Sequence, residues 1–155
     1  MSDLSTVNKL LNEIEADIDF RDKLNPTISK ADVAWHLYHS LKTINTICEA
    51  LKASNPEDFK STFGLPKIFV MTFGIIPRGK ARAPKSVKPP ENILTKNIKS
   101  QLELARENVS LIQGLDRKKN FYHPIFGYLN KNKTIRFLGI HTNHHLKIVR
   151  DILSK

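Results

Sequence analysis

The sequence has only one cysteine, which excludes an internal disulfide framework. This residue, Cys48, lies in an apolar helical pattern, so we expect a buried structural thiol and a cytoplasmic protein. The opening residues carry Asp3 and alternate polar with apolar side chains, which predicts no secretory leader. The longest apolar-rich run, residues 68–76, is too short to span a bilayer, so we expect no membrane partner.

Acidic residues are also few. The chain has 15 Asp plus Glu against 25 Lys plus Arg, which gives a net charge of +10 and suggests anionic partners. A nucleic-acid-binding face would gather basic residues with aromatic ones. Here the basic residues are scattered over residues 67–88, 117–119, 131–136 and 147–155. The scatter favours solubility or weak attraction of anions over nucleic-acid binding.

Four segments repeat apolar residues at three- and four-residue spacing, which predicts four amphipathic helices. These segments are residues 4–18, 33–51, 94–112 and 132–153. Ser29 and Asp32 have the spacing of a capping box, so we expect the second helix to begin at Ser29. Gly114 predicts the end of the third helix.

These helices predict an all-α fold, a four-helix bundle that forms a single domain over residues 1–155. The second and third helices are separated by a long insertion of about 37 residues, a length that is usually functional or structured. Its aromatic-rich part, residues 63–76, could form a short helix or hairpin over one end of the bundle and a homodimer contact. Its other part, residues 77–85, is basic and irregular.

Five of the six histidines fall on predicted helices. On the fourth helix, His141 and His145 are four residues apart and point toward the apolar stripe, while His144 lies near the polar face. On the second helix, His36 lies about 85° from the centre of the stripe and His39 about 145°. His36 is therefore the better inward candidate.

Imidazoles that point into a bundle are costly unless each has a hydrogen-bond partner or a metal. One interpretation is a set of buried histidines bonded to one another, to Tyr or Asn, or to backbone carbonyls. The other is a metal site of His36, His141 and His145, because His-x-x-x-His gives adjacent ligands and a facing helix completes a trigonal set. Helical periodicity alone leaves both interpretations open.

Three motifs resemble a known family. Residues 28–37, Ile-Ser-Lys-Ala-Asp-Val-Ala-Trp-His-Leu, resemble the Ser-x-x-(acid)-x-x-x-His start of the second helix in the DinB/YfiT-like superfamily. Residues 141–145, His-Thr-Asn-His-His, are similar to its His-x-x-x-His. His-Pro-Ile-Phe-Gly at 123–127 is similar to a bacterial branch of that superfamily. The resemblance covers the whole chain, but Leu146-Lys147 stands where many relatives have Arg-Gly-Gln, and the insertion is longer than in smaller members.

The resemblance implies a four-helix bundle that holds a divalent cation on three histidines, here His36, His141 and His145. Characterised relatives include S-transferases and isomerases that use low-molecular-weight thiols. Zinc or nickel suits imidazole well, and iron and manganese stay open. We therefore expect a metal-dependent enzyme that activates a thiol or water for transfer to, or hydrolysis of, a small-molecule substrate.

Other residues are candidates for supporting roles. His39 and His144 each neighbour a proposed ligand and could shuttle protons or replace a ligand, against the plainer interpretation of solvated or capping side chains. Four residues could contact a substrate, against the plainer interpretation of a turn or a solvated loop: His123, Arg78, Lys80 and Arg82.

Two alternatives to an enzyme remain. A non-catalytic binding module with a basic surface would recruit an anionic partner through salt-sensitive contacts. A degenerate relative of the superfamily would bind no metal at all.

Overall fold

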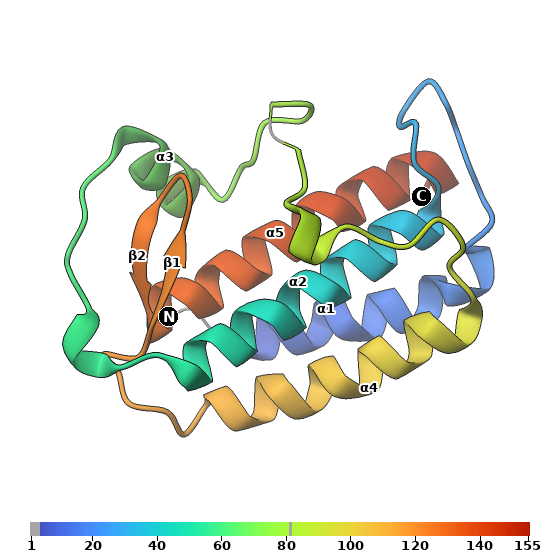
Figure 1. The fold of residues 1–155 in the computed structure, drawn as a ribbon. Coiled ribbons are helices and arrows are strands. Elements are labelled where there is room, and N and C mark those ends of the chain that lie inside the picture. Colours follow the sequence, from blue (N-terminus) through green and yellow to red (C-terminus); the bar gives the residue numbers. More distant parts are fainter. Residues whose placement is uncertain (1–3, 81) are drawn as a thin grey trace.

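A computed structural model describes residues 4–80 and 82–155 and is mostly helical (Figure 1). Its helices are α1 (Leu4–Asp17), α2 (Val33–Ala53), α3 (Leu65–Phe73), α4 (Thr95–Ile112) and α5 (Lys131–Leu153). Its strands are β1 (Asn120–His123) and β2 (Gly127–Asn130), and its short 3-10 turns are η1 (Ile18–Phe20), η2 (Pro56–Asp58) and η3 (Lys85–Val87). The described residues thus form the four predicted helices, a fifth helix, α3, and a small hairpin.

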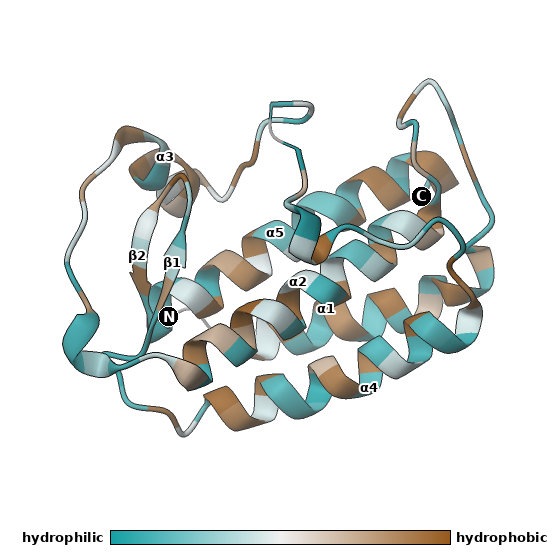
Figure 2. Cartoon of the chain, in the orientation of Figure 1, coloured by the Kyte–Doolittle hydropathy of each residue, from teal (hydrophilic) through white to brown (hydrophobic). Residues whose placement is uncertain are grey.

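The four long helices pack into a bundle. In it α2 packs against α4 and α5, and α1 packs against the same two helices. All four long helices contribute to one hydrophobic core, and hydrophobic and hydrophilic residues alternate along each of them (Figure 2). Because α2 is also covered by η3 and the hairpin, 13 of its 21 residues are buried. Bundle-like packing is confirmed, and α2 is its most enclosed helix.

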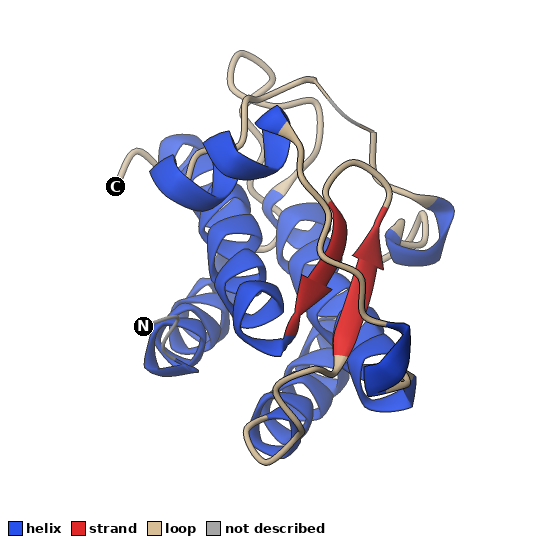
Figure 3. Cartoon of the chain, turned by 90° about the vertical axis from the view of Figure 1, so that its left-hand side faces the viewer, coloured by secondary structure: helices blue, strands red, loops and turns tan. Residues whose placement is uncertain are grey.

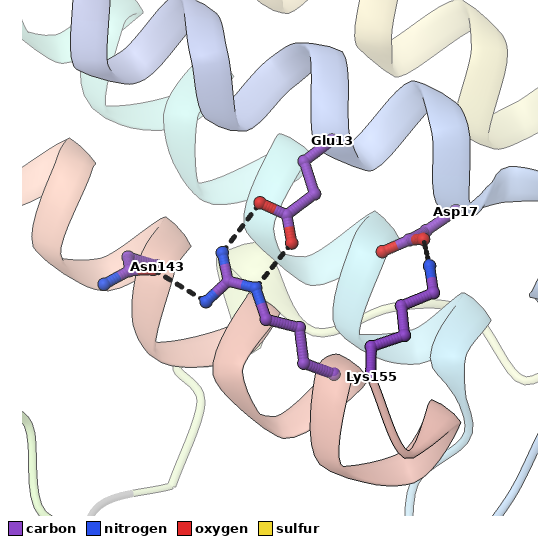
Figure 4. Close-up of polar contacts among 5 residues, drawn as sticks. Glu13, Asp17, Asn143 and Lys155 are labelled. Carbon is purple, nitrogen blue, oxygen red and sulfur yellow. Dashed lines mark hydrogen bonds and ion pairs between the residues drawn. The ribbon is translucent and has the colours of Figure 1, made fainter.

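Ion pairs attach the end of α5 to α1. Arg150 donates to both carboxylate oxygens of Glu13, at 2.6 and 2.7 Å, and also to the side-chain oxygen of Asn143. Lys155 pairs with Asp17, whose side chain is buried (Figure 4). A bidentate Arg–carboxylate pair fixes geometry as well as adding energy. These contacts help to hold the rotation of α5 about its axis, which decides where its histidines point.

One of two predicted helix ends differs in the structure. Asp32, and not Ser29, is the N-cap of α2, because its carboxylate accepts the Trp35 backbone N–H at 2.8 Å. At the end of α4, Gly114 does not adopt the left-handed conformation expected of a C-terminal glycine. The Lys131 ammonium group donates instead to backbone carbonyls that follow this helix. The predicted start at Ser29 was wrong because Asp32 satisfies the first turn of α2, whereas α4 ends at Ile112, two residues before Gly114, as predicted.

The hairpin and α3 stand together at one end of the bundle (Figures 1 and 3). β1 and β2 are antiparallel, with Phe121 opposite Leu129, and this small hairpin adds to the mostly helical fold an element that the sequence did not predict. Lys67 of α3 is buried and donates to the Thr62 and Tyr128 carbonyls at 3.0 and 2.8 Å. Since Tyr128 lies on β2, this lysine attaches the insertion to the hairpin.

The outward face of α3 is apolar and exposed. Leu65, Phe69 and Phe73 keep 74%, 45% and 63% of their surface accessible, although an apolar stripe of this kind is normally covered.

None of the helices in the described part of the chain is long and apolar enough to cross a membrane.

Candidate metal centre

Three imidazoles meet between α2 and α5. His39 comes from α2, and His141 and His145 come from successive turns of α5. One nitrogen from each ring lies within 4.8 Å of the other two. The ring centroids are 4.6 Å apart for His39 and His145, 4.8 Å for His141 and His145, and 5.1 Å for His39 and His141. A buried three-histidine group that could hold a metal ion is therefore present.

His36, which the sequence favoured as the ligand from the second helix, lies beside this group. Its Nδ1 is 3.0 Å from Nδ1 of His145, and its Nε2 is 3.0 Å from Oγ of Ser29. The structure brings His39, in place of His36, together with both histidines of α5. A direct bond from His36 to a metal stays a prediction.

The orientation of His39 is fixed by the insertion. Its Nδ1 lies 2.9 Å from the backbone oxygen of Val87, which can only accept, so Nδ1 carries the proton. Trp35 stacks on the ring at a centroid distance of 4.8 Å. Metal-binding histidines commonly donate their second N–H to such an acceptor, which fixes the tautomer and the ring orientation. Nε2 of His39 is thus left with a free lone pair.

His141 has an unsatisfied nitrogen. Its Nδ1 is buried and has no hydrogen-bond partner among the described residues. Buried polar atoms normally have a partner, and an orphaned one calls for an explanation such as an ion or a water. This atom is the observation on which the fit of a metal to the site rests.

Burial keeps the whole group neutral. Desolvation lowers the pKa of His36 to about 4 and, against a hydrogen bond to Val87 that raises it, lowers the pKa of His39. The pKa values of His141 and His145 fall well below their usual value, first through burial and then through repulsion by neighbouring histidines. Neutral imidazole is the form that binds metals. The group is therefore ready for a cation at neutral pH.

The spacing suits one small divalent ion. Imidazole nitrogens that share a tetrahedral zinc at about 2.1 Å lie about 3.4 Å apart. Separations of up to 4.8 Å between these nitrogens need ring shifts of about 1 Å to reach that spacing, which are small for side chains. Three protein ligands leave coordination positions open, as in catalytic sites. Burial raises the pKa of the Cys48 thiol to about 12, which agrees with the expected structural thiol.

The other predicted residues surround the group at different distances. The ring of His144 is 5.0 Å from that of His145, and burial and the nearby Arg78 lower its pKa. Arg78 itself pairs with Asp151 at 2.7 Å. Lys80 and Arg82 are exposed on the loop that follows α3. Their roles toward a substrate or a proton stay predictions.

His123 holds a turn. Its Nδ1 accepts the backbone N–H groups of Ile125 and Phe126 at 3.1 and 3.2 Å, and its ring stacks on Phe126 at 4.2 Å. Burial lowers its pKa to about 4. These contacts agree with the turn-forming interpretation, and contact with a substrate stays a prediction.

Comparison of the chain with protein-family models, with curated proteins and with solved structures finds no match in any of the three. The resemblance to the DinB/YfiT-like superfamily therefore stays a prediction beyond the mostly helical fold and the three-histidine group.

Proposed function

We propose that this chain is a divalent-metal-dependent enzyme that activates a thiol or a water molecule for transfer or hydrolysis. The observation that carries the proposal is the convergence of His39, His141 and His145. One of them, His141, has a buried nitrogen with no hydrogen-bond partner in the described part of the chain. An ion on three imidazoles would act as a Lewis acid and lower the pKa of a thiol or water bound to it. Zinc or nickel suits this donor set best.

The protein would hold the ion in surroundings with little water. Trp35 lies against His39 and His145, with a centroid distance of 6.0 Å to the latter. The ring of Phe137 lies 5.7 Å from the ring of His141. Apolar walls strengthen electrostatic interactions in such a site and limit side reactions with solvent. The roles of Trp35 and Phe137 are therefore to shape the site and to exclude water from it.

A cleft suggests where a substrate would bind. Trp35 also lines a cleft of about 440 Å³ beside the start of α2. Its walls carry three basic and three acidic residues: Arg21, Lys30, Lys88, Asp22, Asp32 and Glu91. Such mixed charge suits a small molecule with both ammonium and carboxylate groups. A low-molecular-weight thiol built from amino acids has this character, and we propose that class as the co-substrate.

The test is a thiol-transfer assay on metal-loaded protein. Cysteine-containing small thiols are combined with an activated aromatic electrophile, and loss of free thiol is followed with zinc, with nickel and with excess chelator. We expect activity that needs the metal and is abolished by His141→Ala, while Lys118→Ala, at an exposed position between α4 and β1, retains most of it. Metal binding without turnover of any thiol or hydrolysable ester would contradict the enzymatic proposal.

One observation favours a second candidate function. Residues 59–90 contain seven Lys or Arg and no Asp or Glu. A binding module for an anionic partner would use this segment, independently of the histidines. Binding of a polyanion that weakens steeply with salt and survives His141→Ala would favour this function over the enzyme.

A further inference from the structure

A chain of hydrogen bonds leads from the surface of the bundle to the metal group. Ser29 Oγ lies 3.0 Å from Nε2 of His36, and Nδ1 of His36 lies 3.0 Å from Nδ1 of His145. Only 4% of His36 and 9% of His145 is exposed. Such a buried contact between two neutral rings requires one nitrogen to donate and the other to accept. The contact therefore fixes the tautomers of both rings together.

Only two arrangements of protons satisfy this chain. In the first, His145 donates from Nδ1 to His36, and His36 donates from Nε2 to Ser29. In the second, both bonds run the other way, and His145 then carries its proton on Nε2. The Ser29 hydroxyl oxygen already accepts the Ala31 N–H at 3.1 Å, and it has a second lone pair for His36.

We propose that His36 is a positioning residue that accepts the Nδ1 proton of His145 and so directs the His145 Nε2 lone pair at the metal. This inference rests on the proposed metal site. A bound ion selects the first arrangement, because a protonated Nε2 cannot bind a metal. His36 would then serve His145 as the Val87 carbonyl serves His39.

The proposal explains the position of Ser29. This serine lies outside α2, seven residues before His36, and does not cap the helix. By accepting from His36 Nε2–H, its hydroxyl leaves Nδ1 of His36 as the acceptor. Ser29 thus lies at the outer end of the chain of hydrogen bonds. Through His36 it orients the proposed metal ligand His145.

The first test measures metal affinity by competition with a chromophoric zinc chelator. His36→Leu keeps the volume but removes the acceptor, whereas His36→Asn places a carbonyl oxygen near the original Nδ1. We expect His36→Leu to bind one zinc about 10- to 100-fold more weakly. His36→Asn should stay within about threefold of the wild type. Unchanged affinity in His36→Leu, or complete loss of binding like that in His141→Ala, would overturn the positioning role.

The second test needs no variant. Nitrogen-15 NMR of histidine-labelled, zinc-loaded wild-type protein reports which nitrogen of each ring carries the proton. We expect His145 with the proton on Nδ1 and His36 with the proton on Nε2. A proton on His145 Nε2 in the loaded protein overturns the inference while the metal site stands. A wild-type protein that takes up no zinc overturns the proposed function itself.

Discussion

The buried His36 should make the metal-free protein sensitive to mild acid. Its pKa is about 4 in the folded chain, against 6.5 for a free histidine, because burial opposes its charged form. The unfolded chain therefore takes up this proton first as the pH falls below 6.5, and the folded state loses stability down to about pH 4. Above pH 6.5 both states are neutral at this residue and stability does not depend on it.

The size of this effect follows from the two pKa values. The full difference corresponds to about 3 kcal/mol in the free energy of unfolding, of which about 2 kcal/mol is lost by pH 5. We would measure urea unfolding by circular dichroism at pH 7 and pH 5 in excess chelator, for the wild type and His36→Asn. The variant should lose about 2 kcal/mol less between these pH values. Carboxylates titrate in both proteins and cancel in the comparison, so equal losses would refute the assignment of a buried, neutral His36.

Three further changes test the surroundings of the site. Gly127→Ala should destabilise the protein by about 1–3 kcal/mol in urea unfolding. The reason is that φ of Gly127 is +67° and an added Cβ would lie 2.5 Å from Thr62 Oγ1. An unchanged free energy of unfolding would mean that the hairpin turn is not as described. Lys67→Met should cost about 1–3 kcal/mol in the same assay, because the part-buried carbonyls of Thr62 and Tyr128 would lose their donor. Retained stability would show that these oxygens reach water. Phe73→Glu on the exposed face of α3 should abolish the self-association we expect of the wild type in light scattering, and a wild type that stays monomeric at high concentration would contradict that expectation.

Much of the bundle could be predicted from the sequence because its helices have regular apolar stripes. The fourth helix was predicted to begin at residue 132, and α5 begins one residue earlier, at Lys131. The agreement is close because the apolar stripe of this helix continues between Asn130 and Leu153. The hairpin was missed because each strand has only four residues, too few to establish an alternating pattern. The short helix α3 was one of two structures expected for the aromatic part of the insertion.

The burial of His39 shows where helical periodicity fails. A single apolar stripe places one face of a helix inward, and by that rule His39 points away. α2 is instead enclosed on several sides by α4, α5, η3 and the hairpin, so both histidines are buried. What distinguishes them is the Val87 carbonyl, which lies 48 residues further along the chain and binds only His39. The local sequence pattern around His39 does not indicate a contact with a residue so far along the chain.

The most direct measurement is the metal content of untagged protein, determined by elemental analysis for the wild type and for His36→Ala, His39→Ala and His141→Ala. We predict close to one divalent metal per chain in the wild type, loss of that metal in His39→Ala and His141→Ala, and weakened but detectable binding in His36→Ala. A wild-type protein purified without metal that also fails to take up zinc or nickel would contradict the existence of the metal centre.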